Sequence, residues 1–185
     1  MTLFEQLSAY QPCCEQENAD QALMLRYLAT FPDNILTRNN PMAHITASAW
    51  VVTPKRDKVL MVYHNIYNSR SWTGGHADGE DDLLDVALRE VKEETGLKNI
   101  RPVTEDIWSL EILSVAAHTR RGEFVSAHLH LNVTYLIEAD ESEALYVNPD
   151  ENSGVRWFSA DEVAERSSEP EMRVVYRKLM EKLTT

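Results

Sequence analysis

The sequence predicts an α+β fold in which helices cover a mixed β-sheet, forming an αβα sandwich. Residues 43–52 alternate between two sets of side chains with a period of two, which is typical of a β-strand. Residues 82–95 instead place apolar side chains at helical spacing, and Gly96 follows as a residue that commonly ends helices. Because strand and helix patterns are interspersed along the chain, we expect one layered core.

The first part of the chain, residues 1–40, is expected to form a helical extension packed on a domain of residues 41–185. Asn18 and Gln21 resemble a capping box, so a helix is expected to start there. Pro32 is expected to end this helix, because proline cannot continue one.

Strand patterns dominate the middle of the chain. Residues 58–64 form a second strand candidate, and a glycine turn at residues 72–75 ends this region. Two longer strand candidates follow the helix, at residues 107–115 and 125–137. The acidic segment 139–153 is rich in turn residues and is expected to be a loop.

The C-terminal part is expected to contain one short strand followed by two helices. Residues 155–158 predict a short strand, and Ser159 with Glu162 resembles a capping box for a brief helix. A final helix is expected from Ser168, with Pro170 in its first turn and one apolar stripe along its length.

Composition narrows the class of function. The chain has 185 residues, 43% of them hydrophobic, and a net charge of −12. Such an acidic chain is not expected to bind nucleic acid, whose phosphates favour basic surfaces. It can hold a phosphorylated small molecule only if bound cations reverse the local charge.

Targeting and redox features point to the cytoplasm. The acidic, apolar-poor N-terminus predicts no signal peptide, and no apolar run approaches the length of a membrane span. Cys13 and Cys14 are adjacent and cannot form a disulfide framework, so we expect two reduced thiols.

The helix at residues 82–95 carries the clearest chemical signal. Glu90 and Glu94 fall at the edge of its buried stripe, one turn apart, and Glu93 lies alongside. Carboxylates crowded in this way repel one another, and a Mg²⁺ ion relieves that repulsion because it prefers carboxylate oxygens. An ordinary acidic helix with scattered salt bridges is the alternative explanation of the cluster.

The spacing around this helix resembles the Nudix box. Residues 75–97 read Gly-x5-Asp-x7-Arg-Glu-Val-Lys-Glu-Glu-Thr-Gly-Leu, and the flanking strands extend the resemblance to roughly residues 43–165. The resemblance implies a Nudix-like αβα sandwich that hydrolyses the phosphoanhydride bond of a nucleoside diphosphate linked to another group. Mg²⁺ is the implied cofactor, with Mn²⁺ as a substitute. Asp81 stands where the family usually has Glu, and Thr73 where it often has Pro.

Residue roles follow from the same resemblance. Glu90 and Glu94 are expected to be the principal metal ligands, with Glu93 and the backbone carbonyl of Gly75 as further ligands. Arg89 and Glu93 are also candidate catalytic residues, because Arg89 can reach Glu93 one turn along the helix and hold its rotamer.

A general base is expected on a later loop. Glu151, six residues before Trp157, is the best match by position to the family's loop glutamate. Its rivals within the same acidic segment are Asp150, Glu141 and Glu143.

Histidines supply candidate substrate-binding residues. His128, His130 and Asn132 share one face of a predicted strand, which is either solvent-facing or the floor of a substrate cleft. A His-x-His pair on a strand is also typical of zinc, but no third or fourth ligand is adjacent in sequence. His76 lies within the glycine loop and is expected either to contact a phosphate or to stabilise the loop.

Two other functions are compatible with the motif. One is a Nudix-fold sensor that binds a metabolite without hydrolysing it. The other is an isoprenoid diphosphate isomerase, which requires a reactive cysteine near the site, whereas Cys13 and Cys14 lie far upstream. The expected partner is a small nucleoside diphosphate derivative, without nucleic acid or membrane, and a homodimer is compatible with the sequence.

Overall fold

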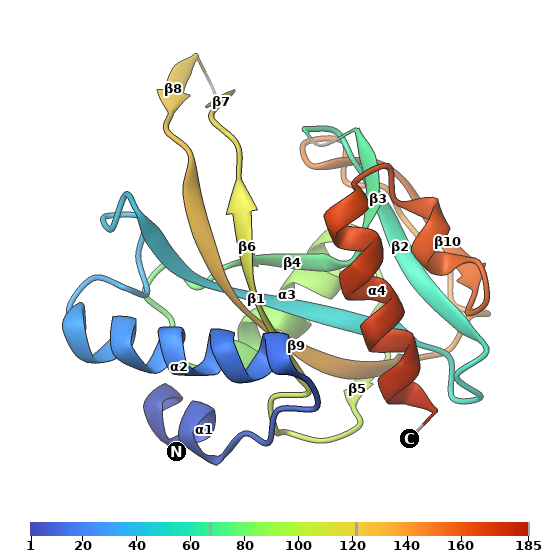
Figure 1. Cartoon of the computed structure of the whole chain (residues 1–185). Coiled ribbons are helices and arrows are strands. Elements are labelled where there is room, and N and C mark those ends of the chain that lie inside the picture. Colours follow the sequence, from blue (N-terminus) through green and yellow to red (C-terminus); the bar gives the residue numbers. More distant parts are fainter. Residues whose placement is uncertain (67, 121, 185) are drawn as a thin grey trace.

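The structure is a computed structural model that describes residues 1–66, 68–120 and 122–184. One mixed β-sheet forms its centre, with helices packed around it (Figure 1). The helices are α1 (Leu3–Ala9), α2 (Glu15–Thr30), α3 (Leu83–Thr95), α4 (Pro170–Leu183) and the 3₁₀ turn η1 (Val163–Arg166). The strands are β1 (Ala43–Val52), β2 (Lys58–His64), β3 (Ser69–Ser71), β4 (Thr73–His76), β5 (Ile100–Pro102), β6 (Ser109–Val115), β7 (His118–Arg120), β8 (Glu123–Val125), β9 (His128–Ala139) and β10 (Asn152–Ser159).

Two long strands organise the sheet. β1 and β9 pair in parallel, from Ala43 opposite Leu129 to Val52 opposite Glu138. The sheet continues in the order β10-β2-β1-β9-β5, with β3 on β2, β4 on β1 and β6 on β9. β7 and β8 pair separately and extend away from the body (Figure 1). The predicted mixed α+β fold is therefore confirmed.

Helices α3 and α4 cover opposite faces of the sheet (Figure 1). On the α3 face, Ile45 and Val133 pack with Val86, and they belong to the larger of two clusters of buried apolar side chains. On the α4 face, Trp50 stacks on Tyr176, with ring centroids 5.3 Å apart. Alternation along β1 thus sends successive side chains to two different cores.

Helix α2 protects an edge of the sheet. The side-chain amide of Gln16 donates to the carbonyl of Leu110 at 3.1 Å, and Asp20 accepts from the backbone N–H of Ile112 at 2.9 Å. Leu110 and Ile112 lie on β6, whose other side pairs with β9. These contacts satisfy backbone groups that an edge strand otherwise leaves open for pairing with another chain.

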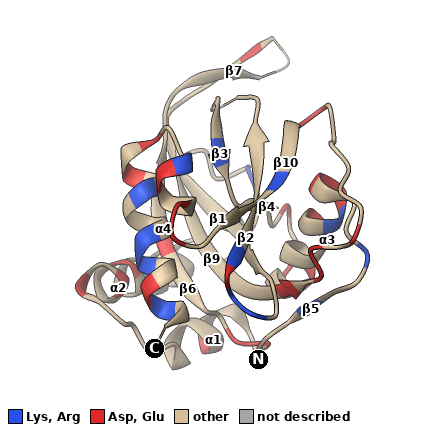
Figure 2. Ribbon diagram, turned by 90° about the vertical axis from the view of Figure 1, so that its right-hand side faces the viewer, with Lys and Arg blue, Asp and Glu red and all other residues tan. Residues whose placement is uncertain are grey.

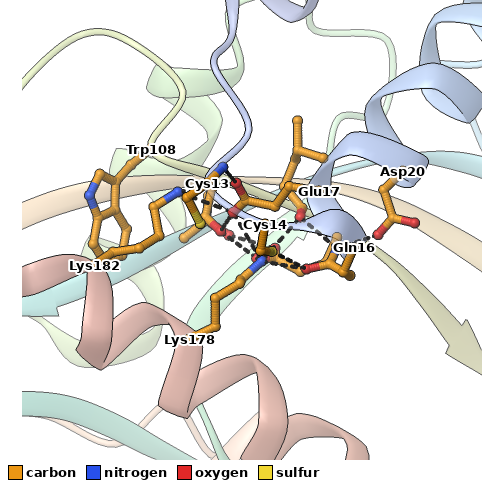
Figure 3. Close-up of polar contacts among 12 residues, drawn as sticks. Cys13, Cys14, Gln16, Glu17, Asp20, Trp108, Lys178 and Lys182 are labelled. Atoms are coloured by element: carbon orange, nitrogen blue, oxygen red, sulfur yellow. Dashed lines mark hydrogen bonds and ion pairs between the residues drawn. The ribbon is translucent and has the colours of Figure 1, made fainter.

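A buried ionic network joins α2 to α4 (Figure 3). Glu17 is fully buried, and its carboxylate accepts from the Tyr10 hydroxyl at 2.6 Å and the backbone N–H of Cys13 at 2.9 Å. Lys178 and Lys182 each lie 3.1 Å from the same carboxylate. A buried charge is tolerated only when paired and hydrogen-bonded in this way, so the network fixes the position of α2.

Two predicted helix starts were wrong. Helix α2 begins at Glu15, three residues before the predicted start at Asn18, which lies inside it. Gln21 donates instead to the carbonyls of Leu7 and Tyr10, tying α1 to α2. The brief helix expected at Ser159 is a 3₁₀ turn that starts at Val163, because β10 continues through Ser159.

The turn predicted at residues 72–75 was also wrong, because residues 73–75 lie in strand β4. The start of the final helix agrees more closely with the prediction. The final helix starts at Pro170, two residues after Ser168, and its stripe is buried at Met172 and Tyr176. No helix in the described part of the chain has the length and apolar character that crossing a membrane requires.

Candidate active site

Strand β4 brings the glycine segment against α3. Gly75 pairs with Ala47 of β1, and its backbone lies directly against the side chain of Glu90. A Cβ atom on Gly75 would lie 2.4 Å from Glu90 Cδ, and one on Gly74 would lie 2.5 Å from Ser48 Oγ. The atoms near Gly74 include the backbone oxygen of Ala47 at 2.7 Å, so only glycine fits there, whereas a side chain at Gly75 would displace the Glu90 carboxylate.

Helix α3 is defined at both ends by local chemistry. Asp82 caps the N-terminus by accepting from the backbone N–H of Asp85 at 3.1 Å. Gly96 ends the helix in the left-handed conformation, with φ of 75°. The predicted helix and its glycine stop are confirmed, and the buried stripe includes Val91 and Glu94.

Glu94 is the most deeply placed carboxylate of the helix. Its side chain is only 3% exposed, and Oε1 accepts from the backbone N–H of Gly74 at 2.8 Å. The side-chain amide of Asn152 donates to the backbone carbonyl of Glu94 at 2.9 Å. Strands β4 and β10 therefore hold the end of α3 from two directions.

The electrostatics of the site favour the protonated forms of Glu90 and Glu94 when no metal is bound. Burial, followed by repulsion from Glu93 and Glu151, raises the pKa of Glu90 to about 7. Burial, against the lowering effect of the Gly74 N–H and with repulsion from Glu90 and Glu151, raises the pKa of Glu94 to about 8. Figure 2 shows further Asp and Glu residues along α3.

These observations fit a hard divalent cation. Crowded carboxylates with raised pKa values are the donor set that Mg²⁺ prefers, and binding it removes both the repulsion and the need for protons. Glu90 and Glu94 are the residues that would hold the ion. The backbone of Gly75 lies beside Glu90, where its carbonyl was expected to contribute.

Glu93 and Arg89 lie at the outer side of the cluster. The guanidinium Nε of Arg89 is 4.0 Å from Glu93 Oε1, and both side chains are about half exposed. The structure thus contains the predicted contact one turn along the helix. It is a weak surface ion pair, so its effect is to restrict a rotamer rather than to stabilise the fold.

In the acidic loop, Glu151 lies near this cluster, whereas two of its rivals bind other parts of the chain. Glu151 is exposed, and its charge acts on both Glu90 and Glu94. Glu141 pairs with Lys58, and Glu143 accepts from the backbone N–H of Lys98 at 2.7 Å.

Two further sequence candidates are exposed. Asp150 is an exposed residue of the same loop. Asp81 is exposed in the turn before α3, where its backbone N–H donates to Glu80 Oε1 at 3.0 Å. The catalytic roles of the loop residues stay predictions.

The predicted histidines lie on the opposite face of β4 from Glu90. The Gly75 backbone faces Glu90, so by alternation His76 projects to the other side, where its ring centroid is 4.8 Å from that of His130. His128 contacts His130, and His44 joins the group with its ring 5.0 Å from His76. Substrate binding by these histidines stays a prediction.

Sequence reasoning missed His44. It precedes His76 and His130 by many residues, and only the parallel register of β1 and β9 places it opposite His130. Burial lowers the pKa of His44 and lowers that of His130 to about 2. The signal that could have found it is the polar side of the first predicted strand, which begins with this histidine.

Asn132 is buried rather than open to a ligand. It is 1% exposed, and its amide oxygen accepts from Thr46 at 3.0 Å and Ser48 at 2.8 Å. Its amide nitrogen donates to Glu111 at 3.2 Å and Thr134 at 3.0 Å. A bond from this side chain to a substrate would require these contacts to change.

Solved structures resemble this fold. A C. elegans Ap4A hydrolase superposes with a TM-score of 0.56 at 17% identity, covering 76% of this chain and 97% of that one. The E. coli dihydroneopterin triphosphate pyrophosphohydrolase gives a TM-score of 0.53 at 13% identity, covering 74% and 94%. At such identities the likeness concerns the fold alone.

Sequence comparison identifies a relative and the family. A protein of Lactococcus lactis subsp. cremoris named "Probable DHNTP pyrophosphohydrolase" is 29% identical over 107 residues, which are 57% of this chain. The match spans 60% of that protein's length. The model of the NUDIX domain matches residues 42–182. This match covers most of the chain and includes the glycine segment, α3 and the loop of Glu151, and the chain therefore belongs to the NUDIX family.

Proposed function

We propose that this protein is a Mg²⁺-dependent pyrophosphohydrolase acting on a nucleoside diphosphate linked to another group. The observation that carries the proposal is the pair Glu90 and Glu94, two carboxylates held against the glycine segment with raised pKa values. A chain that placed these groups only for stability would gain nothing from crowding them, because like charges and burial both cost free energy.

Each residue of the site has a distinct task in this reaction. When bound, Mg²⁺ supplies positive charge to the diphosphate oxygens and makes the attacking water more acidic. Glu90 and Glu94 hold the ion, and the Gly74 N–H fixes the orientation of Glu94. Arg89 restricts Glu93. In this proposal Glu151 takes the proton of the water as it attacks phosphorus.

The relative from Lactococcus adds a substrate class to test. Its printed name makes dihydroneopterin triphosphate a candidate beside nucleoside diphosphate derivatives. Both classes present the same phosphoanhydride bond, and groups outside α3 must select between them. Because the match covers only part of that protein, dihydroneopterin triphosphate enters as one member of the screen.

A metal-dependent screen tests the proposal. The purified chain is incubated with nucleotide sugars, ADP-ribose, dinucleoside polyphosphates, nucleoside triphosphates and dihydroneopterin triphosphate, with and without Mg²⁺. We expect the chain to cleave the phosphoanhydride bond of at least one compound, and this cleavage should require Mg²⁺. The rate should be about a thousandfold lower in Glu94→Gln. Asp85→Asn is the matched control, since Asp85 is exposed on the same helix.

The sensor hypothesis predicts a different result. Mg²⁺-dependent binding of one compound without any turnover by the wild-type chain would favour it over the hydrolase. Cleavage that Glu94→Gln leaves unchanged in a folded protein would contradict the assignment of the metal site. The isomerase is disfavoured because Cys13 and Cys14 lie at the junction of α1 and α2, where Cys13 contacts Glu17.

A further inference from the structure

Four histidines gather on the face of the sheet opposite α3. His44 comes from β1, His76 from β4, and His128 and His130 from β9. Their ring centroids are 4.8 to 5.2 Å apart for the pairs among His44, His76 and His130. One nitrogen from each of these three rings lies within 4.8 Å of the other two. The register of the sheet therefore brings imidazoles from three separate strands together.

The hydrogen bond of His44 indicates which of its ring nitrogens carries the proton. His44 Nδ1 lies 3.2 Å from the backbone carbonyl of Asn40, and only a protonated Nδ1 can form a hydrogen bond with a carbonyl oxygen. Nε2 is then an unprotonated acceptor. It is fully buried, the side chain is only 5% exposed, and Nε2 has no hydrogen-bond partner among the described residues.

This arrangement is the usual one for a metal-binding histidine. In metal sites the ligating imidazole donates its other N–H to a carbonyl or carboxylate, which fixes both the tautomer and the ring. A buried polar atom without a partner costs free energy, so its presence calls for a ligand. The contact of His44 with Asn40 meets the first condition, and its orphaned Nε2 meets the second.

His128 repeats the same pattern beside the group. Its Nδ1 lies 2.9 Å from the carbonyl of Ser126, which again assigns the proton to Nδ1. Its Nε2 is 3.2 Å from Nε2 of His130. This hydrogen bond places His128 beside the group, although its nitrogens do not lie within 4.8 Å of all three other ligand nitrogens.

We propose that His44, His76 and His130 bind a divalent transition-metal ion such as Zn²⁺, with the fourth position open to water as in other three-histidine sites. Imidazole nitrogens favour such ions, whereas Mg²⁺ favours the carboxylate oxygens around Glu90 on the other side of β4. The three nitrogens need to approach one another by at most about 1.5 Å to reach tetrahedral geometry. This proposal does not depend on the proposed hydrolase activity, because the ion binds to different residues.

Such an ion has a structural consequence for the glycine segment. It fastens β4 to β1 and β9 through His76, which is the residue directly after Gly75. The glycine segment would then be held on one face by the histidine site and on the other by its contacts with Glu90 and Glu94.

Metal titration of the full chain tests this inference. The protein is stripped with a chelator and titrated with Zn²⁺ in excess Mg²⁺, which occupies the carboxylates, and binding is followed by calorimetry. Co²⁺ is used in parallel because its visible spectrum reports tetrahedral nitrogen ligation. We expect one Zn²⁺ per chain, a tetrahedral Co²⁺ spectrum, and affinity at least about tenfold weaker in His76→Gln and His130→Gln.

Three matched variants separate this site from its competitors. His64→Gln changes a histidine outside the group, Glu94→Gln changes the carboxylate site, and Cys13→Ser with Cys14→Ser removes the cysteines that lie with Glu17 in a second cluster of potential ligands. All three are expected to keep the stoichiometry and affinity of the wild-type chain. Circular dichroism establishes that each variant is folded.

Two outcomes would overturn the inference. One is the absence of both stoichiometric Zn²⁺ binding and a tetrahedral Co²⁺ spectrum in the wild-type chain, a result that depends on no variant. The other is binding that His76→Gln leaves intact while Glu94→Gln or the cysteine variant removes it.

Discussion

At the scale of single residues, Glu94 shows how one side chain links the fold to the chemistry. It belongs to the buried stripe of α3, yet it carries a carboxylate that the core cannot stabilise. The N–H of Gly74 compensates only part of its charge, and burial still raises its pKa to about 8. In the metal-free protein the protonated form of Glu94 is therefore favoured, and a bound cation can take the place of that proton.

This preference predicts how the stability of the metal-free protein depends on pH. The folded pKa of about 8 lies above the ordinary value of 4.5, so the folded chain holds this proton more tightly than the unfolded chain. The contribution is present below pH 4.5 and is lost as the pH rises through 8. Glu94→Gln is expected to remove this loss and to raise the Tm at pH 9 by on the order of 5 °C without metal.

The measurement is thermal unfolding from pH 5 to pH 9 with and without Mg²⁺. In the wild-type chain Mg²⁺ should restore most of the stability lost at high pH, whereas Glu94→Gln should respond weakly to the ion. Parallel pH profiles for the two proteins, with equal Mg²⁺ responses, would show that Glu94 neither carries the raised pKa nor holds the ion.

At the scale of elements, the amphipathic helices and long strands were predictable and the short strands were not. α3 has a capping Asp82, a periodic stripe and a terminal Gly96, so local chemistry alone determines it. β4 has two glycines and little intrinsic preference for a strand. It forms because Gly74 and Gly75 permit close packing against Ser48 and Glu90, contacts that exist only in the folded sheet.

The candidate sites divide in the same way. The carboxylates of α3 are neighbours in the sequence, and helical geometry is enough to group them. The histidine group depends on the register between β1 and β9, which the alternation of either strand does not determine. The N-terminal helix start was mispredicted because Gln21 uses its amide to bind α1 rather than to cap α2.

The loop before β10 supports a prediction about the general base. Backbone contacts fasten this loop to the end of α3, including Tyr146 N–H to Thr95 O at 2.8 Å. If Glu151 accepts the proton of the attacking water, Glu151→Gln should lower kcat by ~10²- to 10⁴-fold with little change in KM. Glu141→Gln and Glu143→Gln serve as matched controls, since those carboxylates bind Lys58 and Lys98.

Steady-state kinetics with the substrate found in the screen decides this prediction. The two control variants should keep kcat within a few-fold of the wild-type value. A silent Glu151→Gln combined with an inactive Glu93→Gln would move the base from the loop into α3, leaving the loop a role in substrate recognition.

At the scale of the whole molecule, the network around Glu17 joins the N-terminal helices to the rest of the chain. Burial alone would raise the pKa of Glu17, but the Cys13 N–H, the Tyr10 hydroxyl and two lysines lower it to about 2. The same lysines connect α4 to β6, because Lys178 also lies 2.8 Å from Glu111. One carboxylate therefore holds together segments from both ends of the sequence.

The lowered pKa of Glu17 predicts an acid-sensitive fold. Because the folded pKa of about 2 lies below the ordinary value of 4.5, the stabilisation is complete above pH 4.5 and is lost as the pH falls toward 2. Glu17→Gln leaves the largely buried Lys182 without its carboxylate partner and is expected to lower the free energy of unfolding at pH 7 by ~3–5 kcal/mol. It should also flatten the decline in stability between pH 4.5 and pH 2. Glu15→Gln, at an exposed position two residues earlier on the same helix, should change neither quantity. Urea unfolding of the three proteins across this pH range measures both effects, and equal stabilities for Glu17→Gln and Glu15→Gln would show that the network does not hold the N-terminal helices in place.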